Sequence, residues 1–251
     1  MIRPLIAGNW KMYKTPSEAE DFARELREIP KFDDRDILVC PPFTAIAKVR
    51  KVLDQTGIFV GAQNVYPAEE GAFTGEISPK MIKEAGAQYV ICGHSERRQI
   101  FNEDDEFISK KVKIVLQYGM IPILCVGETL MQNEAGETFN VVEAQLKTGL
   151  KKVSDNEIKN VVIAYEPVWA IGTGKNATPQ QAQTVHSFIR KILKEMFGDI
   201  ASSIRILYGG SVKPENIDQL MAEQDINGVL VGGASLKIDS FSRIIGFNKN
   251  H

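Results

Sequence analysis

The chain has 251 residues, 43% of them hydrophobic and 25% charged, which is the composition of a globular protein with a sizeable core. Its 30 Lys and Arg residues against 32 Asp and Glu residues give a formal net charge of −2. That charge provides no overall attraction to nucleic acid or to an anionic membrane. No apolar segment approaches the ~20 residues of a membrane span, and the first residues lack the apolar centre of a signal peptide. We therefore expect neither nucleic acid nor membrane as a partner.

Three cysteines, Cys40, Cys92 and Cys125, lie within or beside apolar runs, and none belongs to a CxxC motif. An odd number of buried, unpaired thiols is typical of a reducing compartment. The expected location is the cytoplasm.

Short apolar runs alternate with longer amphipathic stretches along the whole chain. In chain order, each expected strand and the helix after it are Leu5–Met12 and Ser17–Ile29; Ile37–Pro41 and Thr44–Gln55; Phe59–Gln63 and Pro79–Ala85; Tyr89–Cys92 and Asp104–Tyr118; Ile121–Gly127 and Thr138–Val153; Val161–Glu166 and Thr178–Phe197; Ile204–Gly209 and Pro214–Glu223; Gly228–Gly232 and Asp239–Phe247. Ser17 and Glu20 are spaced as a capping box for the first helix, and Pro179 and Pro214 suit a first helical turn.

Strict alternation of strand and helix predicts a parallel sheet with right-handed crossovers. An open doubly wound sheet and a closed (β/α)8 barrel both satisfy this pattern. Eight strands in 251 residues, with no composition break, repeat or linker, favour the barrel. The predicted fold class is therefore α/β, a (β/α)8 barrel with eight parallel strands that forms a single domain over residues 1–251.

Reactive groups of a barrel lie where its strands end, so polar residues at those points are candidates for chemistry. Asn9 and Lys11 are two residues apart in the first strand run, which predicts that they face the same side. His94 follows the fourth strand at a possible helix N-terminus, which would favour a neutral imidazole. Glu166 ends the sixth strand, before Pro167 stops strand pairing. Each of these residues alone also has a purely structural interpretation, but their convergence predicts an active site.

The last two strands end in paired glycines, Gly209-Gly210 before Ser211 and Gly232-Gly233 before Ala234. Paired glycines let backbone N–H groups point at a ligand, and loops after strands seven and eight often bind phosphate in this fold. Tight turns without a ligand are the alternative explanation.

The segment after Glu166 contains two glycines and two large apolar side chains, as a lid over a reacting group does. Its sequence from Gly172 to Ala177 also matches the dinucleotide pattern GxGxxA. That pattern requires a strand that turns directly into a helix, whereas the next helix is expected only near Pro179. It is not a P-loop either, because Trp169 occupies the position of the required first glycine. The sequence therefore predicts a lid and not a nucleotide site.

With these residues assembled, the chain closely resembles the triosephosphate isomerase family over essentially its full length. The resemblance rests on AGNWKM (Ala7–Met12), VICGHSERR (Val90–Arg98), AYEPVWAIGTGK (Ala164–Lys175), LYGGSV (Leu207–Val212) and GVLVGGASL (Gly228–Leu236). It implies interconversion of D-glyceraldehyde 3-phosphate and dihydroxyacetone phosphate through an enediolate, without cofactor or metal.

The resemblance also implies roles for individual residues. Glu166 would be the base that moves a carbon-bound proton, and His94 would act on the substrate oxygens as a neutral imidazole. Lys11 and Asn9 would be catalytic and substrate-binding, and the remaining substrate contacts would come from Gly172, Ser211, Gly232 and Gly233. Supporting residues would be Ser95, Glu96, Cys125 and Tyr208. The lid would consist of Pro167, Val168, Trp169, Ala170, Ile171, Gly172, Thr173, Gly174, Lys175, Asn176 and Ala177.

The family has a long loop after the third strand that inserts into a second subunit. The corresponding segment here is 64–79, with a tip at Phe73, Thr74, Gly75 and Glu76, so the resemblance implies a homodimer. Two other interpretations stay open at this point. One is a different phosphate-binding barrel enzyme such as an aldolase, for which Lys11 would be the nucleophile, and the other is a barrel that binds ligands without catalysis.

Overall fold

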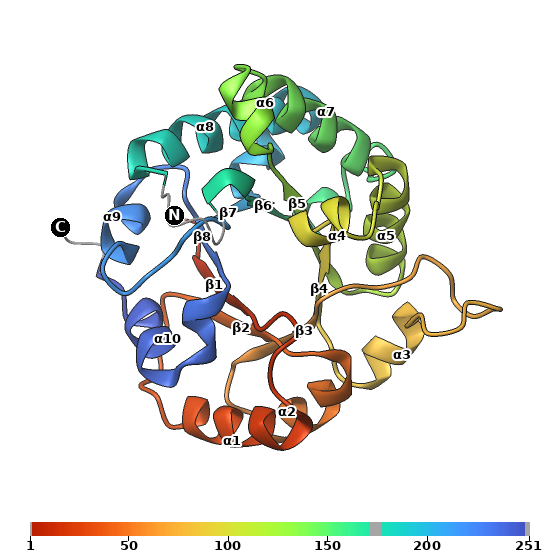
Figure 1. Cartoon of the computed structure of the whole chain (residues 1–251), viewed down its shortest axis with the longest axis vertical. Helices are drawn as coiled ribbons and strands as arrows, with labels where there is room; N and C mark the ends of the chain where they lie inside the picture. Colours follow the sequence, from red (N-terminus) through yellow and green to blue (C-terminus); the bar gives the residue numbers. More distant parts are fainter. Residues whose placement is uncertain (1, 171–176, 249–251) are drawn as a thin grey trace.

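The computed structural model describes residues 2–170 and 177–248. Within these residues eight parallel strands form a closed barrel in sequence order, with β8 paired to β1 (Figure 1). The predicted (β/α)8 barrel is thus confirmed, and the open doubly wound sheet is excluded. The strands are β1 (Leu5–Asn9), β2 (Asp36–Cys40), β3 (Phe59–Ala62), β4 (Tyr89–Cys92), β5 (Ile121–Val126), β6 (Val162–Tyr165), β7 (Arg205–Tyr208) and β8 (Gly228–Val231).

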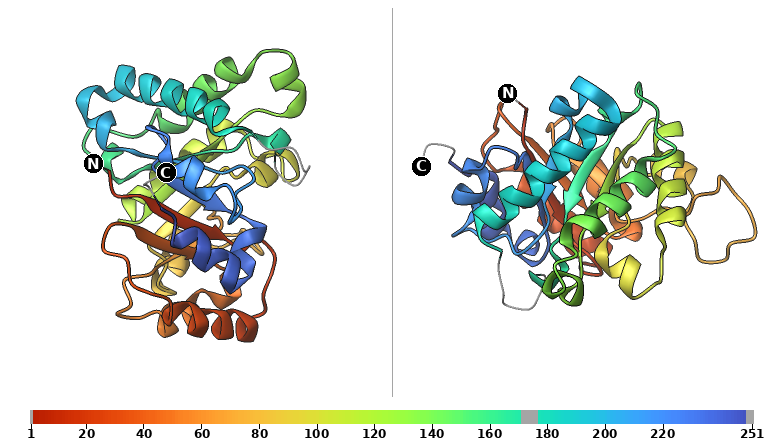
Figure 2. Two further views of the ribbon diagram at one scale, coloured as in Figure 1. Left: turned by 90° about the vertical axis from the view of Figure 1, so that its left-hand side faces the viewer. Right: turned by 90° about the horizontal axis from the view of Figure 1, so that it is seen from above.

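Helices form a ring outside the strands (Figures 1 and 2). They are α1 (Pro16–Arg27), α2 (Ile46–Val52), α3 (Pro79–Glu84), α4 (Ser95–Gln99), α5 (Asp105–Gln117), α6 (Leu130–Glu134), α7 (Thr138–Leu150), α8 (Pro179–Phe197), α9 (Ile217–Ala222) and α10 (Ile238–Ile245). Short 3₁₀ segments are η1 (Phe43–Ala45), η2 (Ile158–Asn160), η3 (Val168–Ala170), η4 (Gly198–Ser203) and η5 (Gly233–Leu236). None of the helices in the described part of the chain has the length and apolarity required to cross a membrane.

Side chains along each strand alternate between two apolar layers, as the period of a strand requires. One layer packs between strands and helices. The other fills the barrel interior with Leu5, Ala7, Leu38, Cys40, Tyr89, Ile91, Ile123, Cys125, Val162, Ala164, Leu207 and Leu230. Continuing this alternation by one step places Asn9 after Ala7 and Glu166 after Ala164 on the inward side. Strand period therefore aims both residues at the mouth of the barrel.

Several helix boundaries differ from the prediction. The cap of α1 is not Ser17 with Glu20 but Thr15 with Glu18, because Pro16 already occupies the first helical turn. The Thr15 hydroxyl accepts the Glu18 N–H, and the Glu18 carboxylate accepts the Thr15 N–H at 2.7 Å. The helix expected from Pro214 begins only at Ile217. The one-turn helices α4 and α6 lack the apolar periodicity from which longer helices are predicted.

Candidate active site

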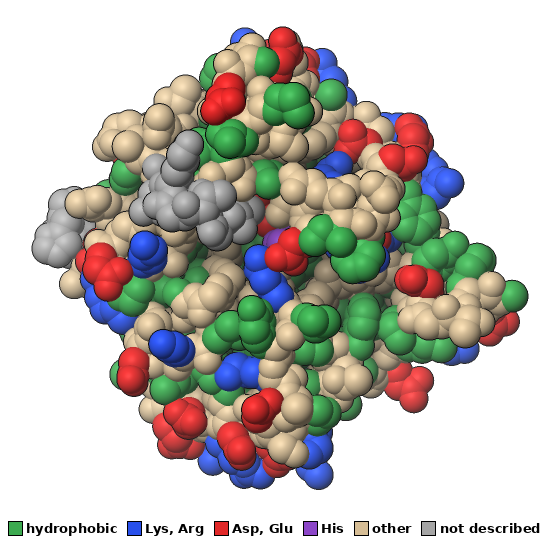
Figure 3. Space-filling model, viewed as in Figure 1, with side chains coloured by type: hydrophobic (Ala, Val, Ile, Leu, Met, Phe, Trp, Pro, Cys, Tyr) green, Lys and Arg blue, Asp and Glu red, His purple; other side chains and the backbone are tan. Residues whose placement is uncertain are grey.

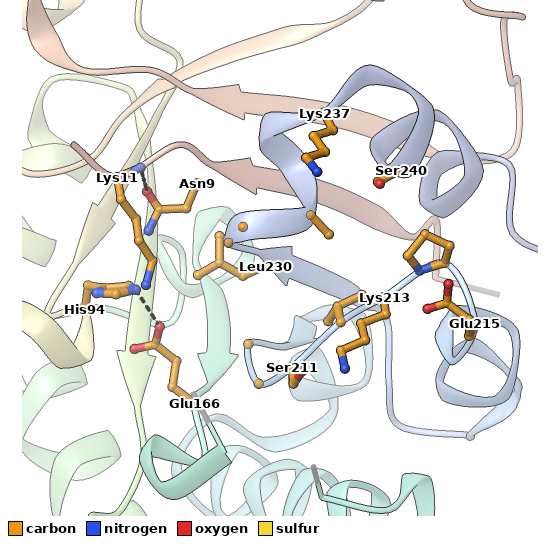
Figure 4. Close-up of a pocket in the computed structure, with 17 residues that line it drawn as sticks. Asn9, Lys11, His94, Glu166, Ser211, Lys213, Glu215, Leu230, Lys237 and Ser240 are labelled. Carbon is orange, nitrogen blue, oxygen red and sulfur yellow. Dashed lines mark hydrogen bonds and ion pairs between the residues drawn. The ribbon is translucent and has the colours of Figure 1, made fainter. Parts of the chain in front are cut away.

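A cavity of about 530 Å³ opens at the carboxyl ends of the strands (Figure 4). The residues around it come from distant parts of the chain. Those that the sequence singled out and the structure brings together are Asn9, Lys11, His94, Glu166, Gly209, Gly210, Ser211, Gly232 and Gly233. Gly172 and the rest of the expected lid from Ile171 to Asn176 lie outside the described residues.

Glu166 is buried at the end of β6, with 2% of its surface exposed. Its Oε1 lies 2.9 Å from Nε2 of His94, and its Oε2 accepts the backbone N–H of Ser95 at 2.9 Å. Burial alone would raise the pKa of Glu166, but the charge and hydrogen bond of His94, together with the Ser95 N–H, lower it overall. The carboxylate is therefore ionised at neutral pH although it is buried.

His94 is the N-cap of α4, as its position after β4 suggested. Its Nδ1 accepts the backbone N–H of Glu96 at 3.2 Å, so the hydrogen-bond pattern assigns the proton of a neutral ring to Nε2, which faces Glu166. Burial acts to lower the pKa of His94, but the adjacent Glu166 carboxylate outweighs it and raises the pKa above its ordinary value. The Glu96 N–H opposes this effect, because a protonated Nδ1 could not accept it.

Lys11 reaches the cavity by a different route from the predicted one. The strand β1 ends at Asn9 and does not extend to Met12, so Lys11 lies in a turn with a φ of +50°. This left-handed conformation is strained for a residue with a side chain. Its backbone N–H donates to the Asn9 side chain at 3.0 Å, and Gln63 Nε2 donates to the Lys11 carbonyl at 2.8 Å. Gln63 also donates to the Cys40 carbonyl at 2.9 Å, and thereby ties the turn to β2.

The Lys11 ammonium lies 2.7 Å from the Glu96 carboxylate. A purely structural role for this lysine would be an ion pair with a carboxylate, and the structure contains that partner. Lys11 nevertheless lines the cavity, and its ammonium lies beside the His94–Glu166 pair in Figure 4. An ion pair at the rim of the cavity and a role toward a ligand are therefore compatible.

Glycines occupy the inward positions at the ends of β7 and β8. Gly209 follows the inward-facing Leu207, and Gly232 follows Leu230. A Cβ on Gly209 would lie 2.9 Å from Cγ of Glu166, so this position has no room for a side chain. In the described part of the chain the backbone N–H groups of Ser211 and Gly233 donate to no other protein group. Because the glycines carry no side chains, this side of the cavity keeps space for a ligand. With its free backbone donors, that space suits an anion.

The root of the expected lid is held by Glu128, a residue that sequence reasoning missed. Glu128 is fully buried, and its carboxylate accepts the Trp169 indole N–H at 2.8 Å and the Tyr165 hydroxyl at 3.2 Å. Pro167 is buried, and the next three residues form η3. Glu128 is the second residue after β5, so a search of the fifth strand end could have found it.

The expected supporting residues lie in the surrounding structure. Cys125 is buried in the barrel interior, and burial raises the pKa of its thiol well above the ordinary value. Tyr208 is buried on β7, and burial raises its pKa to about 12. Within residues 2–170 and 177–248, no group of three or more His, Cys, Asp or Glu side chains is arranged to hold a metal ion.

This combination defines a class of protein. An ionised, buried carboxylate touches an imidazole, an ammonium lies beside them, and a glycine-rich anion site faces them across one cavity at the carboxyl end of a (β/α)8 barrel. Such a site belongs to barrel enzymes that move protons on small phosphorylated substrates by general acid–base catalysis.

Comparison with known proteins makes the assignment specific. The family model for triosephosphate isomerase matches residues 4–248. A triosephosphate isomerase of Roseiflexus sp. (strain RS-1) is 56% identical over 249 residues, which are 98% of each chain. Those of Chloroflexus aurantiacus and Carboxydothermus hydrogenoformans are 53% and 55% identical and cover at least 97% of this chain and 98% of the relative. The chain belongs to the triosephosphate isomerase family, which confirms the isomerase interpretation over the aldolase and the non-catalytic alternatives.

Proposed function

We propose that Glu166, His94, Lys11 and Asn9 carry out the reaction of the family in this chain, as parts of a single catalytic domain. The reaction is the interconversion of D-glyceraldehyde 3-phosphate and dihydroxyacetone phosphate, a step of glycolysis and gluconeogenesis. The observation that carries the proposal is the 2.9 Å contact between a buried carboxylate and an imidazole that holds its proton toward it.

Proton transfer begins at carbon. Glu166 removes a proton from the carbon next to the carbonyl, and the C–H electron pair becomes the C=C bond of an enediolate. The carbonyl π electrons move to oxygen, where the Nε2–H of His94 and the Lys11 ammonium stabilise the negative charge. Asn9 donates a hydrogen bond at the same end. Return of the proton from Glu166 to the neighbouring carbon, with His94 moving a proton between the two oxygens, completes the isomerisation.

Both oxygens of Glu166 have partners before substrate binds. A substrate carbonyl that accepts the Nε2–H of His94 takes the place of Oε1 and frees it to approach carbon. Nδ1 of His94 still accepts the Glu96 N–H in this arrangement, so the imidazole acts on the carbonyl as a neutral ring through its Nε2–H. Substrate binding thus frees Glu166 to act as the base and leaves His94 hydrogen-bonded to the substrate carbonyl.

The phosphate group binds on the glycine side of the cavity. The backbone N–H groups of Ser211 and Gly233 donate to it, Gly232 leaves room for its approach, and Gly172 supplies a further donor from the lid. Residues 167–177 close over Glu166, exclude water from the enediolate and keep it from losing phosphate. The hydrogen bond from Trp169 to Glu128 holds one end of this segment.

The variant Glu166→Gln tests the base, because an amide cannot take the proton. We expect turnover of D-glyceraldehyde 3-phosphate in a coupled assay to fall by at least about 10³-fold, while the affinity for glycerol 3-phosphate changes little. Glu25→Gln, an exposed change on α1, is the control and keeps full activity. Near-normal turnover by Glu166→Gln would show that another group is the base.

We also propose that the chain is a cytoplasmic homodimer in which loop 64–79 enters the other subunit. This loop projects from the barrel between β3 and α3 in Figure 1, and hydrophobic side chains gather on this side of the surface in Figure 3. Exposed large apolar residues of the loop and of neighbouring segments are Met12, Tyr13, Phe73, Met81, Ile100 and Phe101. A surface of this kind supports a protein interface.

Phe73 tests the dimer. It is 43% exposed and stacks on Tyr66 with ring centroids 4.3 Å apart. Phe73→Glu is expected to convert a dimer to a monomer at micromolar concentration in analytical ultracentrifugation, because it would bury a charge in the interface. Phe139→Glu is the matched control, since Phe139 is 41% exposed on α7. Equal sedimentation of the Phe73 variant and the parent would contradict the loop contact.

A further inference from the structure

The wall of the cavity around the reacting groups carries more negative than positive charge. Glu166 is ionised, and the single ammonium nearby, Lys11, already pairs with Glu96 at 2.7 Å. The Glu96 N–H donates to Nδ1 of His94 and so assigns a neutral ring, which leaves one cation facing two carboxylates, a net charge of −1. A phosphate ester carries about −1.5 to −2 charges at neutral pH. This inner wall, formed by Lys11, His94, Glu96 and Glu166, therefore repels the phosphate group of the substrate.

The opposite wall of the same cavity carries two further lysines. Lys213 follows the Ser211 loop, and Lys237 lies between η5 and α10. Figure 4 shows both side chains on the side of the cavity away from His94. Within the described residues neither ammonium forms an ion pair, and Glu215 is the one carboxylate that lines this wall with them. The outer wall thus has a net charge of +1, opposite in sign to the inner wall.

We propose that Lys213 and Lys237 determine the specificity of this site for a phosphodianion. Their charges attract the phosphate group, offset the repulsion from the inner wall and orient the substrate with its phosphate toward Ser211 and Gly233. The proposal rests on the phosphate site of the proposed function and extends it from backbone donors to side-chain cations. The two lysines act on the phosphate end and do not touch the carbon atoms that react.

The size of the effect follows from Coulomb's law. For two lysines about 8 Å from a dianion in water-like surroundings, their loss lowers kcat/KM about 15-fold at 10 mM salt and about 5-fold at 0.1 M, and has almost no effect at 1 M. A salt dependence of this kind distinguishes charge attraction from a loss of packing, which added salt would not restore.

The experiment compares two substrates in the double variant Lys213→Met, Lys237→Met. The ratio of kcat/KM for D-glyceraldehyde 3-phosphate to kcat/KM for D-glyceraldehyde, which lacks the phosphate, is expected to fall about 15-fold at 10 mM salt. The double variant with Arg at both positions is expected to keep the ratio of the parent, because it retains both charges. A ratio that is unchanged in the Met variant, or equal losses at low and high salt, would overturn the proposal.

The control is Lys194→Met. Lys194 is exposed in the last turn of α8 and therefore lies at the opposite end of the barrel from the cavity. It should leave the ratio of the two substrates at the value of the parent. Calorimetric binding of glycerol 3-phosphate separates the proposal from the proposed function. If the parent protein binds this ligand but does not isomerise, the proposed function fails, and the affinity of the Met variant still decides the role of the lysines.

Discussion

The contact between Gly209 and Glu166 allows a catalytic defect to be predicted from one added methyl group. In Gly209→Ala the new Cβ would lie 2.9 Å from Cγ of Glu166. Carbon atoms in van der Waals contact are about 3.5–4.0 Å apart, so one of the two must move by about 0.6–1 Å. The backbone of Gly209 is fixed, because its N–H donates to the Tyr165 carbonyl at 2.7 Å. The Glu166 side chain therefore shifts away from its position against His94.

A base that is displaced by about 1 Å loses on the order of 10²-fold in rate, equivalent to about 2.7 kcal/mol of activation free energy. Phosphate binding takes place at other atoms, so the loss should fall on kcat more than on KM. Because the φ of Gly209 is not in the left-handed region, alanine adopts the same backbone, and the cost to stability is that of overpacking, about 1–3 kcal/mol.

A double-mutant cycle provides the control. Glu166→Gln removes the base, so adding Gly209→Ala to it should cost little further activity, whereas the two losses would multiply if the methyl group acted elsewhere. The assay is coupled turnover of D-glyceraldehyde 3-phosphate in the parent, both single variants and the double variant. A kcat within about 3-fold of the parent for Gly209→Ala would refute the argument that this glycine keeps space for the base.

Two further predictions concern His186, which is buried, and Gln63, which is partly buried. His186 is fully buried, and burial lowers its pKa to about 4. Between this value and the ordinary pKa of about 6.5, the imidazole is protonated in the unfolded chain but neutral in the folded chain. The contribution of the buried neutral His186 to the free energy of unfolding is therefore complete above about pH 6.5 and is lost as the pH falls. Urea unfolding should show about 2 kcal/mol more loss between pH 7.5 and pH 5 in the parent than in His186→Gln, and equal losses would disprove it. Gln63→Ala removes the donor to the Lys11 and Cys40 carbonyls, so we expect Lys11 to leave its strained turn and kcat/KM to fall about 10-fold. Unchanged kcat/KM would show that the turn holds without Gln63.

The sequence predicted the barrel and most of the cavity because both depend on local pattern. Alternation along β1 and β6 is enough to place Asn9 and Glu166 on the inward side, without knowledge of their partners. Lys11 was predicted on the correct side of the barrel for a wrong reason. Its position depends on a left-handed turn that β1 alone does not encode, because the donor that holds the turn is Gln63 on a different strand end.

Glu128 shows the same limit more sharply. A carboxylate two residues after an apolar run has the sequence appearance of a surface residue. Its complete burial is explained by its hydrogen-bond donors: the Asn133 amide, and the Trp169 indole and Tyr165 hydroxyl, which come from another segment of the chain. Hydrophobic pattern and secondary-structure propensity in the sequence do not reveal a residue whose role depends on such distant partners.

The two halves of the barrel mouth differ in what they offer a ligand: one half carries functional side chains, and the other carries glycines that leave space. At the inward positions that end β1 and β6 stand a hydrogen-bonding amide and a carboxylate, Asn9 and Glu166, whereas at the equivalent positions of β7 and β8 stand Gly209 and Gly232. A ligand with one reacting end and one anionic end therefore has a single orientation in which both ends are satisfied. Because the polar half is net negative and the glycine half is bordered by Lys213 and Lys237, charge imposes the same orientation as shape. A substitution on the glycine side should consequently alter which ligand binds and how, while one on the polar side should alter what happens to it.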